Sequence, residues 1–149
     1  MGPRTAKNTI YIELLGNAVV YSLNYERFVT DDFNLRAGIE YFSLSASSGT
    51  SSGSANLLIF PLTVSFLGLS KGPHAFELGI GIDLAYASAS TGSAGGSSFS
   101  SGTTVAGTAI AGYRYAPRDG GFNLRAALTP IFNSNGFAPW IGLALGFGI

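Results

Sequence analysis

Large apolar residues alternate with small or polar residues along most of this 149-residue chain. Such alternation is typical of β-strands with one apolar face, and no segment has the periodicity of a helix. The segment Phe-Asn-Leu-Arg-Ala occurs twice, at 33–37 and 122–126. Pro61 lacks an N–H, so a bulge or a locally open pairing is expected there. The pattern predicts eight strands: Asn8–Leu15, Val19–Val29, Asp32 to about Leu44, Asn56–Leu69, Ala75–Ala87, Thr104–Ala116, Phe122–Phe132 and Trp140–Ile149.

The connections between these strands are of two kinds. Three compact turns contain charged residues and follow the second, fourth and sixth strands. The other four connections contain no Asp, Glu, Lys or Arg, and two of them are predicted to be low-complexity Ser/Gly loops, 45–55 and 88–103. Even strand number, strands of about ten residues and short turns on one side only are typical of a transmembrane β-barrel. The compact turns are Thr30–Asp32, Ser70–His74 and Pro117–Gly121, and the uncharged connections are Gly16–Ala18, Ser45–Ala55, Ser88–Thr103 and Asn133–Pro139.

Composition decides which face of the barrel points outward. Charged residues make up 11% of the chain, against about 25% in ordinary soluble domains. The less apolar face is mostly Gly, Ala, Ser and Thr, which suits a crowded interior better than a solvated surface. We therefore predict one domain, 1–149: an all-β, eight-stranded antiparallel up-and-down transmembrane barrel with a polar lumen filled by side chains. The alternatives are a soluble lipocalin-like barrel that binds a hydrophobic ligand, a narrow outer-membrane channel, and an engineered scaffold with simplified loops.

Composition also excludes several classes of function. The formal net charge is zero, so no basic patch is available to bind nucleic acid. Without cysteine, the chain has no disulfides, thiolate zinc sites or cysteine nucleophiles. The sequence also lacks an apolar signal core at its start, so an exported protein would be present here in a mature or recombinant form.

Aromatic residues on the apolar faces cluster near the two ends of the predicted strands. Membrane barrels place aromatic side chains in girdles at both interfaces with water, so we predict two girdles. The girdle near the compact turns contains Phe33, Phe76, Tyr113, Tyr115, Phe122 and Phe147, and the girdle near the loops contains Tyr21, Tyr41, Tyr86, Phe132 and Trp140.

Three segments, 7–16, 21–27 and 112–117, resemble small eight-stranded outer-membrane proteins of Gram-negative bacteria. Together with the last strand they cover most of the chain outside the loops. The resemblance implies location in the outer membrane and, if a signal peptide is present, insertion by the barrel-assembly machinery. Such proteins usually end in an aromatic residue, whereas this chain ends in Ile149. These segments are architectural and include no catalytic motif.

Strand parity places eight charged residues in the lumen. Buried charges must be paired and hydrogen-bonded, so an ion-pair network is predicted. A three-residue turn at Thr30–Asp32 would set Glu26 opposite Arg36, and we predict that they form an ion pair. Five acids against three arginines leave surplus carboxylates. These must be hydrated or protonated unless they lie at an open end of the barrel. The residues are Glu13, Glu26, Arg36, Glu40, Glu77, Asp83, Arg114 and Arg125.

No enzymatic activity, cofactor or metal site is predicted. Barrel enzymes need a histidine at the outer rim, whereas the sole histidine, His74, lies in a compact turn at the other end. A carboxylate pair such as Glu40 with Asp83 could perform acid/base chemistry, but charges that fill a lumen need no such role. The expected partner is a lipid bilayer or detergent, and the expected state is a monomer.

Overall fold

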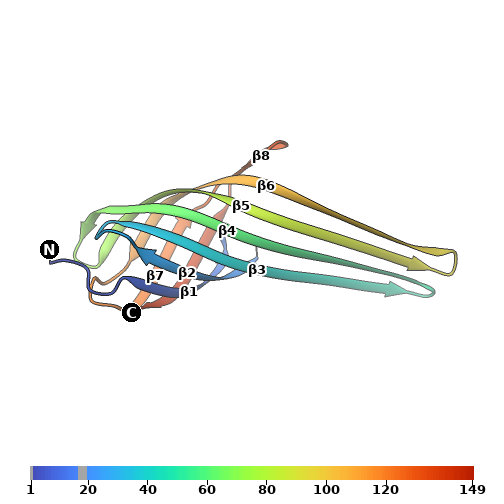
Figure 1. The fold of residues 1–149 in the computed structure, drawn as a ribbon, viewed down its shortest axis with the longest axis horizontal. Helices are drawn as coiled ribbons and strands as arrows, with labels where there is room; N and C mark the ends of the chain where they lie inside the picture. Colours follow the sequence, from blue (N-terminus) through green and yellow to red (C-terminus); the bar gives the residue numbers. More distant parts are fainter. Residues whose placement is uncertain (1, 17–19) are drawn as a thin grey trace.

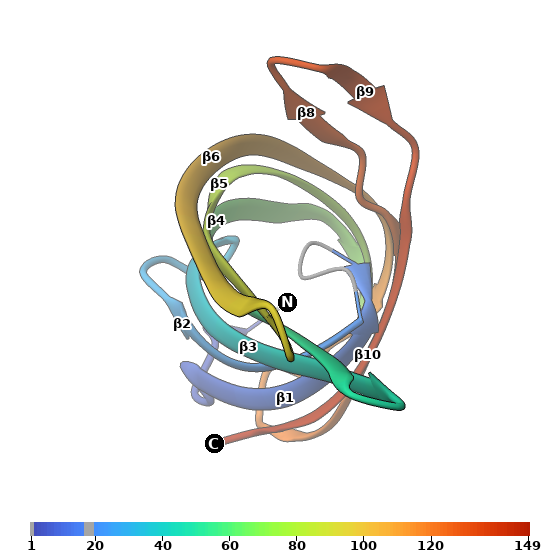
Figure 2. The same ribbon diagram turned by 90° about the vertical axis from the view of Figure 1, so that its right-hand side faces the viewer.

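The computed structural model describes residues 2–16 and 20–149, and all of its strands belong to one antiparallel sheet. Eight strands close into a ring in the order β1, β2, β3, β4, β5, β6, β7 and β10, with β10 paired back to β1. Figure 2 shows this ring end-on. The predicted eight-stranded up-and-down barrel is therefore confirmed. The strands are β1 (Asn8–Leu15), β2 (Tyr21–Phe28), β3 (Phe33–Ser48), β4 (Ser51–Lys71), β5 (His74–Ser93), β6 (Gly96–Tyr115), β7 (Gly121–Leu128), β8 (Ile131–Asn133), β9 (Gly136–Ala138) and β10 (Ile141–Gly148).

Alternation along each strand turns the apolar side chains outward. In β2, Tyr21, Leu23 and Tyr25 are exposed, whereas Ser22 and Glu26 between them are buried. Because the period of a strand is two, one register sorts the whole sheet into an apolar exterior and a polar interior. Within the described part of the chain, no helix is long and apolar enough to cross a membrane.

Two details of register follow from local sequence. The Thr30 hydroxyl accepts from the Phe33 amide at 3.0 Å, which tightens the first turn and sets Glu26 opposite Arg36, as predicted. Between β3 and β4 the pairing passes from Ala37 opposite Leu62 to Glu40 opposite Ile59. It is open opposite Pro61, which has no N–H to donate.

The prediction of low-complexity loops at 45–55 and 88–103 is wrong. These segments continue the strands of two long hairpins, β3–β4 and β5–β6, that project together well beyond the barrel (Figure 1). Small residues keep the alternating backbone pairing, and hydroxyl groups bridge the strands, as between Ser54 and Ser90 at 2.6 Å. A ladder of backbone hydrogen bonds needs no large side chains, so composition alone misidentified these segments.

Two other boundaries differ from the prediction. The seventh strand ends at Leu128, because Pro130 cannot donate to the ladder. The expected loop 133–139 then forms most of a small hairpin, β8–β9, which splays away from the ring in Figure 2. The second strand begins at Tyr21, and Asn17, Ala18 and Val19 lie outside the described residues.

The N-terminal segment reaches across the end of the barrel that has the compact turns. The Arg4 backbone N–H donates to Asp31 at 3.0 Å, and its guanidinium lies 3.7 Å from the ring centre of Phe28. Burial lowers the pKa of Arg4 to about 10, and repulsion from Arg114 and Arg118 adds to this effect. Phe28 belongs to a small buried apolar cluster at this end, with Leu67, Ala75 and Ala116. We infer that the N-terminal segment helps to close this mouth.

Candidate functional site

The barrel interior gathers all eight charged residues that strand parity assigned to it. Each is buried, with at most 4% of its surface exposed. They come from six strands, so the site exists only once the barrel has closed. The residues are Glu13 on β1, Glu26 on β2, Arg36 and Glu40 on β3, Glu77 and Asp83 on β5, Arg114 on β6 and Arg125 on β7.

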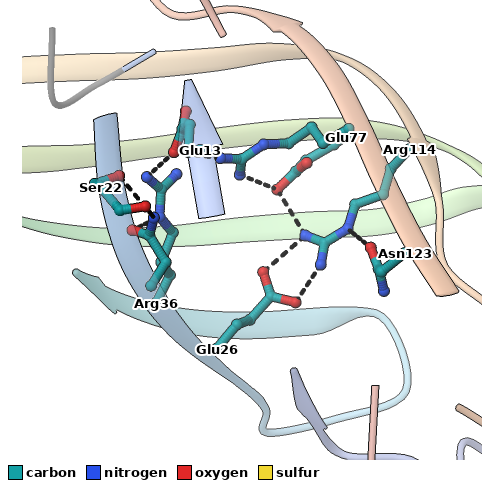
Figure 3. Close-up of polar contacts among 9 residues, drawn as sticks. Glu13, Ser22, Glu26, Arg36, Glu77, Arg114 and Asn123 are labelled. Carbon is teal, nitrogen blue, oxygen red and sulfur yellow. Dashed lines mark hydrogen bonds and ion pairs between the residues drawn. The ribbon is translucent and has the colours of Figure 1, made fainter. Parts of the chain in front are cut away.

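Glu13 joins two arginines on one side of the lumen. Its Oε2 atom accepts from Arg36 (Figure 3) and, at 2.8 Å, from Arg125. Asn24 accepts from Arg36 Nε at 2.9 Å and so fixes the plane of that guanidinium. One carboxylate therefore neutralises part of two buried cations.

Arg114 joins two other glutamates. Its guanidinium forms a two-pronged contact with Glu26, including Nη1 to Oε2 at 2.7 Å, and Nη1 also donates to Glu77 at 3.3 Å. Asn123 accepts from Arg114 Nε at 3.1 Å. Glu77 Oε1 lies 3.5 Å from Arg125 Nη1, which connects this group to Glu13. Three arginines and three glutamates thus form one continuous network with balanced formal charge.

The predicted ion pair between Glu26 and Arg36 is wrong, although the two residues are opposite each other in the sheet. Asn24 binds Arg36 Nε, and the guanidinium then reaches Glu13 on β1. Glu26 instead contacts Arg114, which comes from β6 across the lumen. Long side chains in a narrow barrel can reach the far wall, so neighbouring backbone positions do not determine ion partners.

Glu40 and Asp83 are the surplus carboxylates. Neither joins an ion pair among the described residues. Glu40 Oε1 accepts from the Val20 amide at 3.3 Å, while its Oε2 and both oxygens of Asp83 have no hydrogen-bond partner in the described chain. The described residues include no group of acids and histidines suited to a metal ion.

Tyr11 lies at the centre of the network, and the sequence analysis did not single it out. Its ring centroid is 5.2 Å from the guanidinium carbon of Arg125, 5.4 Å from that of Arg36 and 5.8 Å from that of Arg114. Inward parity with Glu13, two residues later, was the signal that could have identified it. The ring brings an apolar surface among the cations and fills the middle of the lumen.

The middle of the lumen is closely packed. The space between Tyr11, Arg114 and Asn123 is too small to hold a water molecule. A Cβ atom at Gly146 would lie 2.3 Å from Tyr11 Cβ and 2.4 Å from the Ile10 carbonyl oxygen. Glycine at this position allows β10 to pass close to Tyr11.

Comparison with solved structures identifies the architecture. Ail, the attachment invasion locus protein of Yersinia pestis, superposes with a TM-score of 0.59 at 14% identity, covering 99% of this chain and 98% of Ail. The N-terminal β-barrel domain of Pseudomonas aeruginosa OprF superposes with a TM-score of 0.58 at 20% identity, covering 96% of this chain and 98% of that domain. Both are eight-stranded outer-membrane barrels. This chain has the fold of a small outer-membrane β-barrel. No protein-family model and no curated sequence matches it.

On the outside of this outer-membrane-type barrel, nine of the eleven predicted girdle residues are exposed. Tyr115 is half-buried, with its ring 5.4 Å from His74 and 6.4 Å from Phe122. The prediction is wrong for Trp140, which is half-buried with its indole nitrogen shielded from solvent. Trp140 shares the parity of Gly142, which faces the lumen. The exposed nine are Tyr21, Phe33, Tyr41, Phe76, Tyr86, Tyr113, Phe122, Phe132 and Phe147.

Proposed function

We propose that this chain is an integral outer-membrane protein with a closed lumen, which acts structurally or through its projecting hairpins and not as an enzyme. The observation that carries the proposal is the outer surface of the barrel. Ile12, Leu143 and Leu145 are each more than half exposed, and side chains of the same kind surround the ring. An apolar band of this extent would be a liability in water and suits a bilayer.

Folding that depends on an amphiphile tests the membrane assignment. We expect the unfolded chain to refold to a monomer with a strand-type circular-dichroism spectrum in detergent micelles, and to aggregate after dilution into plain buffer. The apolar band needs a partner that water does not provide. A monodisperse folded state in buffer without detergent would instead support the soluble, lipocalin-like alternative. Size-exclusion chromatography with light scattering distinguishes the two outcomes.

The filled lumen supports the proposal of a closed barrel. Tyr11 and the arginine–glutamate network occupy the middle of the interior, and the N-terminal segment lies over one mouth. We expect no steady conductance steps when the refolded protein is inserted into a planar lipid bilayer. Reproducible single-channel steps that scale with the amount of protein would contradict a closed lumen and favour the narrow channel.

The projecting hairpins support a role at the far end of the barrel. They form a sheet rich in Ser, Thr, Gly and Ala, with an open hollow of 630 Å³ lined by residues such as Ser47, Ser90 and Phe99. One comparison structure is Ail in complex with the heparin analogue sucrose octasulfate. The segments 41–70 and 84–113 contain no Asp, Glu, Lys or Arg, so a partner of these hairpins would be uncharged and not sulfated.

A further inference from the structure

Arg27 is an unusual residue on the outer surface of the barrel. Of the charged residues in the described strands, only Arg27 and Lys71 have exposed side chains. Both lie near the compact-turn ends of their strands: Lys71 is the last residue of β4, and Arg27 is the last but one of β2. The residues two positions before and after Arg27, Tyr25 and Val29, are exposed on the same outer face. The arginines that form ion pairs in the described chain are Arg36, Arg114, Arg118 and Arg125. Arg27 forms none with the described residues. At this interfacial position the guanidinium can reach water and the phosphate groups of lipids.

An apolar groove begins at this guanidinium. The sheet register aligns two outward rows across β2 to β5. Ala37 is the smallest side chain in either row and leaves a depression between them. The groove is open along the outer surface and measures 560 Å³. One row is Arg27, Leu35, Val64 and Ile80, and the other is Tyr25, Ala37, Leu62 and Ile82.

Two polar side chains lie beside Arg27 at the same end of the groove. Asn8 is opposite Arg27 on β1, and its Oδ1 accepts from the Tyr25 hydroxyl at 2.7 Å. That hydrogen bond holds the Asn8 amide on the outer surface. A cation, an amide and a hydroxyl therefore meet where the apolar groove ends, near the compact turns.

We propose that this surface binds one glycerophospholipid, with its phosphate on Arg27 and an acyl chain in the groove over Ala37. The planar guanidinium can donate two parallel hydrogen bonds to the oxygens of a phosphate. The apolar side chains of the groove can pack against a lipid acyl chain. The inference rests on the proposed membrane location, in which the compact turns face the phospholipid leaflet. It adds a defined lipid site to a surface that would otherwise contact lipids without preference.

Binding of phosphatidylglycerol to the refolded, delipidated protein in detergent micelles tests the site. Native mass spectrometry measures the fraction of protein that carries one lipid at each lipid concentration. We expect R27Q to weaken binding about tenfold or more, since a charged hydrogen-bonding partner is lost. A37F, which fills the groove and keeps Arg27, should have a similar effect. K71Q removes the other exposed strand cation and should bind like the unsubstituted chain.

Two further ligands separate the parts of the site. Diacylglycerol has the acyl chains without the phosphate, and inorganic phosphate lacks the chains, so each should bind at least about tenfold more weakly than phosphatidylglycerol. Equal binding by R27Q and the unsubstituted chain, or an equal loss in K71Q, would overturn the proposal. Circular dichroism of the same samples shows whether the barrel has folded, which separates the test of the lipid site from the test of the membrane location. A barrel that folds only in detergent but binds lipid independently of Arg27 would contradict the lipid site and leave the proposed function unchanged. If A37F does not fold, R27Q decides.

Discussion

Replacing Glu13 by Gln is expected to lower the free energy of unfolding by about 3–5 kcal/mol, the usual effect of breaking a buried ion pair from one side. The substitution keeps the shape of the side chain and removes its charge. Glu13 accepts from both Arg36 and Arg125, so two buried guanidinium groups lose an anionic partner together. No other carboxylate of the network is shared in this way at such short range.

Glu40 provides the matched control. It is also a buried glutamate of the lumen; its Oε1 accepts from the Val20 amide, and it forms no ion pair among the described residues. Glu40→Gln keeps an oxygen for that amide and removes an unpaired buried charge, so stability should be unchanged or higher. Urea titration of the refolded protein in detergent micelles, followed by circular dichroism, measures both variants. Equal losses in the two would show that the network contributes nothing beyond the presence of carboxylates.

Strand parity accounts for most of what could be predicted from the sequence. The period of two placed Glu13, Arg36, Arg114 and their partners inside, because one register determines the direction of every side chain in a strand. The turn residues Thr30–Asp32 predicted the register between β2 and β3, since local hydrogen bonds close the turn. These are short-range rules, and they held.

Contacts across the lumen could not be predicted in the same way. Arg114 and Glu26 are 88 residues apart, and their meeting depends on the curvature and closure of the whole barrel. The long hairpins were missed for a different reason. Their strands contain few apolar residues, and pairing there depends on backbone groups that every sequence has. Trp140 was misplaced because its aromatic type was given more weight than its parity with Gly142.

Introducing an arginine at Leu145 is expected to destabilise the protein by about 2–4 kcal/mol in lipid vesicles, the effect of a cation near the middle of a bilayer. Leu145 lies in the middle of β10, opposite Ile12 and Leu124, and its side chain is 53% exposed. The control is Leu69→Arg. Leu69 is 62% exposed but lies two residues before the end of β4, near the compact turn, where the effect should fall to about 0–1 kcal/mol.

The comparison of the two arginine variants tests the orientation of the barrel directly. Both residues are exposed leucines on the outer surface, so a soluble protein would accept either arginine with a change within about 0.5 kcal/mol. A membrane barrel distinguishes them by depth, because the bilayer centre solvates a guanidinium poorly while an interfacial side chain reaches water and phosphate. Urea titration in vesicles measures both variants. Equal and small effects would mean that lipid does not surround the apolar face, and the exposed leucines would then have to be covered by another protein or by a second copy of the chain.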